Sequence, residues 1–316
     1  MKFILPGALA ALACAMAPAA HAAEKSGPEA AKAERYRAAM NDARWVGSML
    51  SSNAGTLPKG HFYTEPYFFD VITGGVHYPG SSGFYQYGLA DGFTVGLQPR
   101  FAVDTKRPNP EFRVGDLKLL SQLRVTSFTP ENRIPSIGIA LQESLPIGKH
   151  DKLGRNEDGH GSGSFATEVG FNVQHYFLLK NGRLLRGRIN LLKSFRHGAD
   201  ITNRSVYGTQ PGFRGHAKPG AKTTVIAAVE YSLTREWVLA FDIIRESSAK
   251  TRLKGRYGSG PVIEQELPSS HSIGFAPAVE YSWSDRSGVL FGVWVNPRGH
   301  NSPSSVVPAI AYSRFW

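Results

Sequence analysis

Two histidines have a serine within two residues in the chain, and a histidine with a serine is the pair that a serine hydrolase uses for catalysis. His160 and Ser162 flank a glycine in a Gly-rich stretch, and His271 directly precedes Ser272. A hydrolase needs its serine within hydrogen-bond reach of the histidine, with a third group orienting that base. His160 and Ser162 fall in a predicted loop with no asparagine after them, and adjacent residues of a strand point to opposite faces. We therefore expect no enzyme and keep a lipid hydrolase as the third alternative.

No pattern of metal or cofactor ligands is present in the sequence. The run from Gly154 to Gly159 superficially suggests a calcium loop, but its first and twelfth positions are Gly154 and Phe165, where an EF-hand needs acids. Phosphate-loop and zinc-helix motifs are missing, and Cys14 is the only cysteine. We expect neither a metal nor a cofactor.

A second set of chemically active residues is spread over alternating segments. If even-numbered residues share one face, two groups of opposite charge point inward. The cations are Arg100, Lys118, Arg124, Arg188 and Arg196, on the third to seventh predicted strands. The acids are Glu230, Asp242, Glu246 and Glu280, on the eighth to tenth. Such opposed charges select ions in a pore; the alternative, left open, is ion pairing that fills the interior, with Arg188 and Glu230 as the expected pair.

The elements that carry these charges are strands of period two. Between Ile273 and Trp283 every odd residue is large or apolar and every even residue is small or polar. This pattern is typical of a transmembrane barrel strand, with lipid on one side and a polar lumen on the other. Twelve strands are predicted, near residues 60–73, 82–89, 92–103, 115–128, 134–147, 163–180, 184–197, 222–233, 236–249, 270–284, 288–299 and 304–316. The predicted fold is an all-β, antiparallel, up-and-down transmembrane β-barrel.

The connections support this topology because tight turns alternate with long loops. Tight turns are expected at residues 90–91, 130–133, 181–183, 234–235 and 285–287. Long loops are expected at residues 74–81, 104–114, 149–162, 198–221 and 250–269, whereas the last connection, 300–303, breaks the rule. Outer-membrane barrels have short periplasmic turns and longer extracellular loops, so both ends of the chain should be periplasmic.

Three domains follow from the sequence. Residues 1–22 read as a signal peptide, with Lys2 before an apolar run and Ala20-His21-Ala22 as the cleavage site. Residues 23–58 form an N-terminal extension, a short helix followed by a connector, and residues 59–316 form the barrel. This extension is a plug, a periplasmic extension or a loosely ordered tail, and we favour the tail slightly. The predicted location is the outer membrane.

Aromatic residues mark the lower rim and the end of the barrel. Tyr231, Tyr281 and Tyr312 follow similar sequence at the same point of three strands, which predicts an aromatic girdle at the head groups. Tyr312, Phe315 and Trp316 resemble the C-terminal signal recognised by the barrel-assembly machinery, although Arg314 lies on the apolar face.

A resemblance to a known family adds a function. Residues 56–69 resemble the bacterial family named for a meta-pathway of phenol degradation. Four shorter segments resemble it as well: Gly92-Phe93-Thr94-Val95-Gly96-Leu97, Gly115-Asp116-Leu117, Leu145-Pro146-Ile147-Gly148 and Gly161-Ser162-Gly163-Ser164. The likeness covers residue 45 to the C-terminus. It implies an outer-membrane β-barrel transporter for hydrophobic or aromatic compounds, and it carries no catalytic residues.

The sequence therefore predicts an outer-membrane channel for passive passage of small molecules. Apolar residues on the inward face would suit a hydrophobic solute; they are Leu120, Leu192, Ile226, Val238, Ile244 and Trp294. The formal charge of +11 suits membrane lipid and lipopolysaccharide as partners, and export argues against nucleic acid. The second alternative is a structural barrel with a filled lumen that acts through its surface loops.

Overall fold

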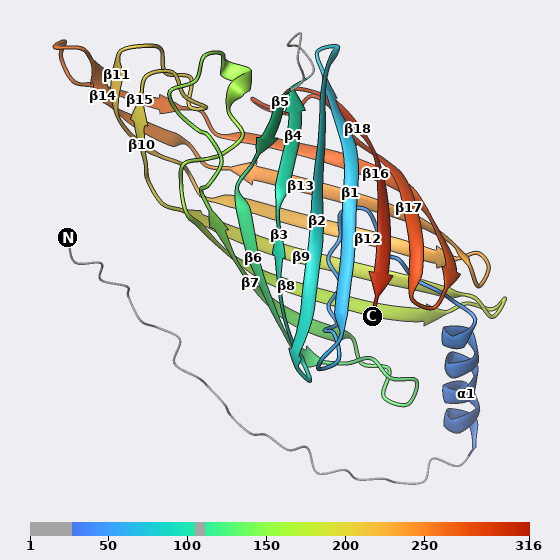
Figure 1. The fold of residues 1–316 in the computed structure, drawn as a ribbon. Helices are drawn as coiled ribbons and strands as arrows, with labels where there is room; N and C mark the ends of the chain where they lie inside the picture. The colour runs from blue at the N-terminus through green and yellow to red at the C-terminus, as the bar shows by residue number, and fades with distance from the viewer. Residues whose placement is uncertain (1–26, 105–110) are drawn as a thin grey trace.

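The computed structural model describes residues 27–104 and 111–316, so the predicted signal peptide and part of one predicted loop lie outside the described residues. Twelve antiparallel strands form the wall of a barrel, which closes because β1 pairs with both β2 and β18 (Figure 1). Ten of these wall strands are continuous: β1 (Phe62–Thr73), β2 (Val76–Ala90), β7 (Ser136–Leu145), β8 (Ala166–Leu178), β9 (Leu184–Arg196), β12 (Lys222–Ser232), β13 (Trp237–Ser248), β16 (Ser270–Ser284), β17 (Ser287–Asn296) and β18 (Ser305–Phe315). The other two wall strands are interrupted: β3 (Phe93–Gln98) continues as β4 (Arg100–Asp104), and β5 (Glu111–Val114) continues as β6 (Leu117–Thr126).

The predicted sidedness of the strands is confirmed by burial. In β13 the side chains of Trp237, Leu239, Phe241 and Ile243 are 40–46% exposed, whereas the intervening residues of that stretch are buried. Strands of a soluble barrel place their large apolar side chains inside, so the outward apolar belt identifies a transmembrane barrel. No helix among the described residues is long and apolar enough to cross a membrane.

The connections agree with the prediction at the short-turn end, and one differs at the other end. Residues 74–81 were expected to form a loop, but β1 and β2 continue to a tight turn at Gly74 and Gly75, whose φ angles are 57° and 74°. Two consecutive residues with positive φ make the turn whose twist suits a hairpin, and glycine adopts it without strain. That prediction was wrong because the strand residues 76–81 are themselves turn-like in composition.

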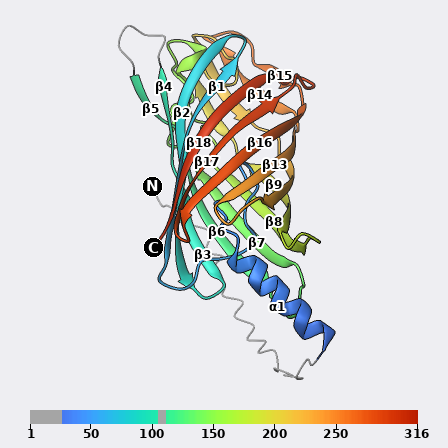
Figure 2. The same cartoon turned by 90° about the vertical axis from the view of Figure 1, so that its right-hand side faces the viewer.

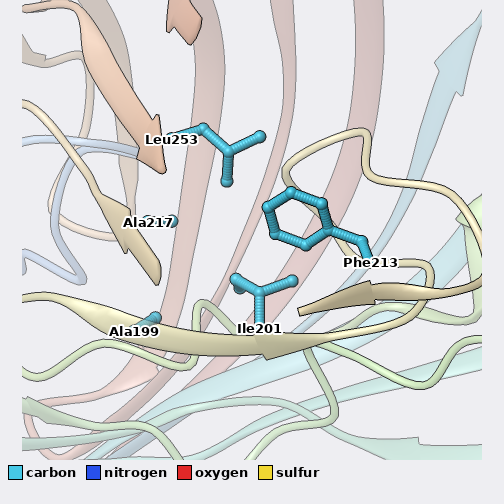
Figure 3. Packing of buried hydrophobic residues seen from close by; sticks show 5 residues of the cluster. All are labelled: Ala199, Ile201, Phe213, Ala217 and Leu253. Atoms are coloured by element: carbon cyan, nitrogen blue, oxygen red, sulfur yellow. The ribbon is translucent and has the colours of Figure 1, made fainter. Parts of the chain in front are cut away.

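The two longest predicted loops contain a second sheet. Its strands are β10 (Ala199–Thr202), β11 (Phe213–Lys218), β14 (Thr251–Tyr257) and β15 (Ile263–Leu267), paired in that order beyond the barrel rim. The core of this sheet is a small apolar cluster shown in Figure 3: Ala199, Ile201, Phe213, Ala217 and Leu253. The loop at 149–162 carries one turn of 3-10 helix, η1 (Asn156–Asp158).

The N-terminal extension begins with α1 (Pro28–Asn41), which lies at the short-turn end of the barrel (Figure 2). Tyr36 and Ala39 pack against Phe128 and Leu184, next to two of the short turns. Residues 44–58 then contact inward side chains of the barrel wall, as described below. A loosely ordered tail is therefore wrong for residues 28–58.

Candidate functional site: a chain segment inside the barrel

Residues 44–58, called the luminal segment here, are bound to the inner wall through their backbone. Two wall carboxylates accept four of its amide hydrogens. Glu280 accepts from Val46 at 2.7 Å and Gly47 at 3.0 Å. Asp242 accepts from Met49 at 3.1 Å and Ser51 at 3.2 Å. The side chains of both acids are fully buried. Two of the four predicted pore acids thus bind the segment.

An arginine pair on β9 forms the ionic centre of the same region. Arg186 Nε lies 2.6 Å from Glu230 Oε2, and Arg188 Nε lies 3.1 Å from the same oxygen. Arg188 also donates to the Ser51 carbonyl at 3.0 Å, and the Arg186 guanidinium lies 4.2 Å from the centre of the Trp45 ring. The expected pair of Arg188 with Glu230 is present. Each arginine also holds the luminal segment.

Amide and hydroxyl side chains continue the contact along the segment. Asn190 accepts from the Ser52 amide at 2.9 Å and donates to the Ser52 carbonyl at 3.0 Å, as a β-strand partner would. Gln122 donates to the Asn53 carbonyl at 2.9 Å, and Thr94 accepts from the Leu57 amide at 2.8 Å. These partners lie on β9, β6 and β3, whereas Glu280 is on β16. The segment therefore crosses from one wall of the lumen to the other.

Small residues of the wall make room for this crossing. A Cβ atom added to Gly138 would lie 2.7 Å from the Ala54 carbonyl oxygen, and one added to Gly292 would lie 2.8 Å from Met49 Sδ. At Gly88 the nearest atom is the Pro58 carbonyl oxygen, closer still. Next to Met49 the wall offers Ala276, Leu290 and Ala311, with which it forms an apolar cluster. The inner surface is thus shaped around the segment.

Ion pairs attach α1 and the start of the segment to the short turns. Arg44 Nε lies 2.6 Å from Asp285, and Arg183 lies 2.9 Å from Asp42. Arg37 pairs with Glu131 and Arg133 with Glu29. The Arg44 hydrogen bond holds the pKa of Asp285 below its ordinary value. The Thr129 hydroxyl, more than Arg37, does the same for the pKa of Glu131.

The other five predicted pore residues make no hydrogen bond or ion pair with the luminal segment in the described part of the chain; they are Arg100, Lys118, Arg124, Arg196 and Glu246. Lys118 is 3.7 Å from Glu168, and Lys222 pairs with Glu246 on the neighbouring strand. Arg100 acts electrostatically on Lys118. Arg196 ends β9 at the long-loop end, and Arg124 is an exposed residue opposite Gly138 near the short-turn end. The structure thus separates the predicted set into a segment-binding group and an outer group.

Sequence reasoning missed several inward residues of the site. Arg186 and Glu65 are buried and follow the same alternation as Arg188 and as the flanking Tyr63 and Tyr67, so parity could have found both. Tyr67 donates to Glu65 at 3.2 Å. No pattern in the sequence pointed to the polar ladder, in which Asn190 donates to Asn172 and Asn172 to Gln122.

The aromatic residues singled out from the sequence lie at the short-turn rim and the end of the chain. The Tyr281 ring is 4.6 Å from Trp237, and the Tyr312 ring is 6.0 Å from Trp283, whereas the Tyr231 hydroxyl accepts from Asn181. The last residues close the barrel, with Phe315 opposite Tyr63 and the Trp316 amide donating to the Phe62 carbonyl at 2.9 Å. Arg314, the exception in the pattern, lies 4.3 Å over the Trp316 ring.

The serine and histidine considered for hydrolysis are not paired. The Ser162 hydroxyl donates to Asp116 at 2.8 Å, and the His160 ring lies 3.0 Å from Arg113 Nη1. Among the described residues no hydrogen bond joins Ser162 to His160. Asp116 also accepts from the Ser162 and Gly148 amides, so it ties the loop at 149–162 to the start of β6.

Comparison with known proteins finds similarity in structure only. No protein-family model matches the chain, and no curated protein matches it in sequence. An outer membrane channel from Pseudomonas putida F1 aligns over 84% of this chain and 98% of its own, with a TM-score of 0.55 and 12% identity. The toluene transporter TodX from Pseudomonas putida aligns over 87% of this chain and 95% of its own, with a TM-score of 0.42 and 14% sequence identity. At such identities the first of these likenesses shows that the two proteins share the barrel fold.

Proposed function

We propose that this protein is an outer-membrane channel for passive passage of small molecules, and that the luminal segment is its plug. The observation that carries this proposal is the way the lumen is filled. The occupant is a separate stretch of chain, and the wall opposite it offers glycine, alanine and polar side chains. A barrel that is permanently filled can instead pack its interior with side chains of its own strands.

The position of the plug favours opening toward the periplasm. The segment enters from α1 at the short-turn end, which is the periplasmic end of an outer-membrane barrel. Its contacts with the barrel are hydrogen bonds, the Arg44 ion pair with Asp285, the Arg186 contact with Trp45 and a small apolar cluster, and no strand in the described part of the barrel depends on it for ladder partners. Withdrawal of residues 44–58 would leave the closed barrel in place and open a polar lumen.

The solute class suggested by the interior is small and at least partly apolar. Ile226, Val238 and Ile244 are buried inward residues, and the wall residue Leu290 adds apolar surface where it packs against Met49 of the plug. The resemblance to the phenol-pathway family favours the same class, hydrophobic or aromatic compounds. The outer charged group, with Arg100, Lys118 and Arg196, would line the path to the extracellular side.

The same proposal includes the partners expected from the sequence. The outward apolar belt contacts membrane lipid, and Tyr231, Tyr281 and Tyr312 anchor its periplasmic edge. Lipopolysaccharide contacts the extracellular half. The barrel-assembly machinery recognises Tyr312, Phe315 and Trp316, after export directed by residues 1–22.

The test compares plugged and unplugged barrels in liposomes. The wild-type protein, a deletion of residues 28–58 and the double variant Asp242→Asn/Glu280→Gln are reconstituted, and the uptake of benzoate, hexane and glucose is measured against empty vesicles. We expect uptake to rise in the order wild type, double variant, deletion, since the variants remove first the plug's charged acceptors and then the plug. Glu246→Gln, whose side chain pairs with Lys222 away from the plug, is the matched control.

Two outcomes would contradict the proposal. If the deletion folds, as shown by β-sheet circular dichroism, and still admits no solute, the protein is a structural barrel with a filled lumen. If wild-type protein cleaves phospholipid or lipid A, and Ser162→Ala abolishes the cleavage, the protein is a hydrolase.

A further inference from the structure

The sheet beyond the rim has one apolar and one basic face. The apolar face holds the cluster around Phe213, and a Cβ atom added to Gly215 would lie 2.8 Å from the Phe213 ring (Figure 3). Residues that alternate with this cluster are on the other face and are exposed. On the two central strands they are Arg214, His216, Lys218, Arg252, Lys254 and Arg256.

The apolar face points toward the mouth of the barrel. Tyr207 packs against the cluster, and its hydroxyl donates to the Ser162 carbonyl at 2.6 Å. Arg196, an inward residue of β9, acts electrostatically on the same hydroxyl. The basic face is therefore turned away from the lumen, and continues the outer surface of the barrel above the membrane.

Cations on this face stand opposite one another across two strands. Arg214 pairs in register with Arg256, His216 with Lys254, and Lys218 with Arg252. Like charges directly opposite each other destabilise a sheet. Carboxylates offset this only at the edges, where Asp200 contacts His216, Glu264 contacts Lys254, and Glu266 contacts Arg252.

The end of the sheet farthest from the barrel is left without compensation. Over residues 27–104 and 111–316, no carboxylate lies within ion-pair distance of Arg214 or Arg256 at this end, or of Lys218 at the end next to the barrel. Two arginines opposite each other serve no purpose in folding, because they repel and bury nothing. A local conflict with no structural gain is a mark of a functional surface.

The barrel surface below the basic face indicates which class of anion this face could bind. The outward residues Leu191, Val225 and Ile273 lie in one row of the barrel wall, and Arg245 completes it. The next row up contains Lys193 and Thr223, joined by a hydrogen bond of 2.8 Å. Going outward, the surface changes from a row with three apolar side chains and one cation, through Lys193 and the exposed Phe195, to the basic face, and an anionic lipid likewise changes from acyl chains to head group.

We propose that the basic face of β11 and β14 binds the phosphorylated head group of lipopolysaccharide, with Arg214 and Arg256 as its phosphate ligands. Arginine suits this role because its planar guanidinium binds phosphate through two parallel hydrogen bonds. The acyl chains of the same lipid pack on the belt at Leu191, Val225 and Ile273. This inference rests on the proposed location in the outer membrane and is independent of the plug.

The test measures binding of fluorescent rough lipopolysaccharide to the full chain in detergent, with EDTA present to prevent bridging by divalent cations. We expect Arg214→Gln/Arg256→Gln to weaken binding about tenfold or more, as cations near an anionic lipid surface contribute strongly to affinity. Arg214→Lys/Arg256→Lys should retain most of the affinity. Lys59→Gln/Lys180→Gln, which removes two exposed cations from the periplasmic end, should bind as the wild type does.

Further arms separate head-group binding from adsorption of the acyl chains and from self-association of the protein. Dephosphorylated lipopolysaccharide should bind the wild type as weakly as the intact lipid binds the Gln variant. Equal binding of both lipids, or unchanged binding by a folded Gln variant, would overturn the proposal. So would a Gln variant that alters only the mass of the protein in light scattering, because the face would then contact a second copy. Liposome uptake should be unchanged in the Gln variant, which keeps this test separate from that of the channel.

Discussion

At the scale of single residues, the charged groups inside the barrel fall into pairs that depend on each other. Glu230 is completely buried between Arg186 and Arg188, whereas Glu280 Oε2 and both carboxyl oxygens of Asp242 accept hydrogen bonds from backbone amides of the luminal segment. Removal of one member of a buried ionic group leaves the other charge without compensation, which costs more than the group contributes when intact. The acids are therefore structural supports of the plug.

Replacement of Glu230 by glutamine should destabilise the protein. The change leaves two buried guanidinium groups beside a neutral side chain, and we expect a loss of about 3–5 kcal/mol in the free energy of unfolding. Urea unfolding in detergent micelles, followed by circular dichroism, measures this loss. Glu246→Gln, in a pair that is more exposed, should cost less than about 1 kcal/mol; equal losses in the two variants would contradict the prediction.

Gly138 gives a test of the fit between the wall and the plug. Because an added Cβ would lie 2.7 Å from the Ala54 carbonyl oxygen, Gly138→Ala should push the plug from its place while leaving the strand intact. We expect a higher frequency of open events in planar bilayers. Gly187→Ala is the control, since its nearest neighbour would be Phe177 at 3.5 Å, an ordinary contact. Identical recordings from the two variants would show that the plug does not block the current.

At the scale of elements, α1 acts as the attachment of the plug to the periplasmic turns. Tyr36 and Ala39 supply the apolar contact, and Arg37, Asp42 and Arg44 supply the polar one. The turns that α1 binds were predicted as tight turns, and a short helix was expected at the start of residues 23–58. Their mutual contact was not predicted, because helix composition alone does not say which surface a helix covers.

Acid should loosen this attachment. The pKa values of Glu131 and Asp285 are lowered in the folded protein, so both groups stabilise it above their ordinary pKa of about 4. That contribution is lost as the pH falls through the lowered values. We expect more frequent opening at pH 3 than at pH 7 in single-channel recordings. The variant Glu131→Gln/Asp285→Asn should open often at pH 7 and show a smaller change on acidification; a wild-type-like pH response in this variant would locate the sensitive group elsewhere.

Most strands could be predicted because period-two alternation is local. The prediction failed where a long-range contact decides the structure. The loops at 198–221 and 250–269 pair with each other as β11 and β14, and the register of two distant loops leaves no periodic signal. The position of the luminal segment was not predicted for the same reason, because its hydrogen-bond partners are spread over β3, β6, β9, β13 and β16. Residues that read as a loose tail in the sequence donate their backbone amides to buried acids in the folded chain.

At the scale of the whole molecule, closure turns alternation into two environments. The pairing of β1 with β18 closes the barrel wall, so side chains on its outward apolar belt face away from the lumen and inward side chains face the lumen or the luminal segment. The outer charged group, with Arg100, Lys118, Arg196 and Lys222, then surrounds the extracellular half of the lumen. Glu168 and Glu246 oppose Lys118 and Lys222, which leaves Arg100 and Arg196 as its uncompensated cations within the described part of the chain.

This imbalance predicts anion preference once the plug is gone. In the barrel lacking residues 28–58, Arg100→Glu/Arg196→Glu should shift the reversal potential in a KCl gradient toward cation selectivity, because charges that line a narrow path attract ions of opposite sign. The shift should shrink at 1 M salt, where screening acts over about 3 Å. Lys180→Glu, in a periplasmic turn outside the lumen, should leave the potential unchanged. If the double reversal has no effect at low salt, ions do not pass Arg100 and Arg196, and the conducting path must lie elsewhere.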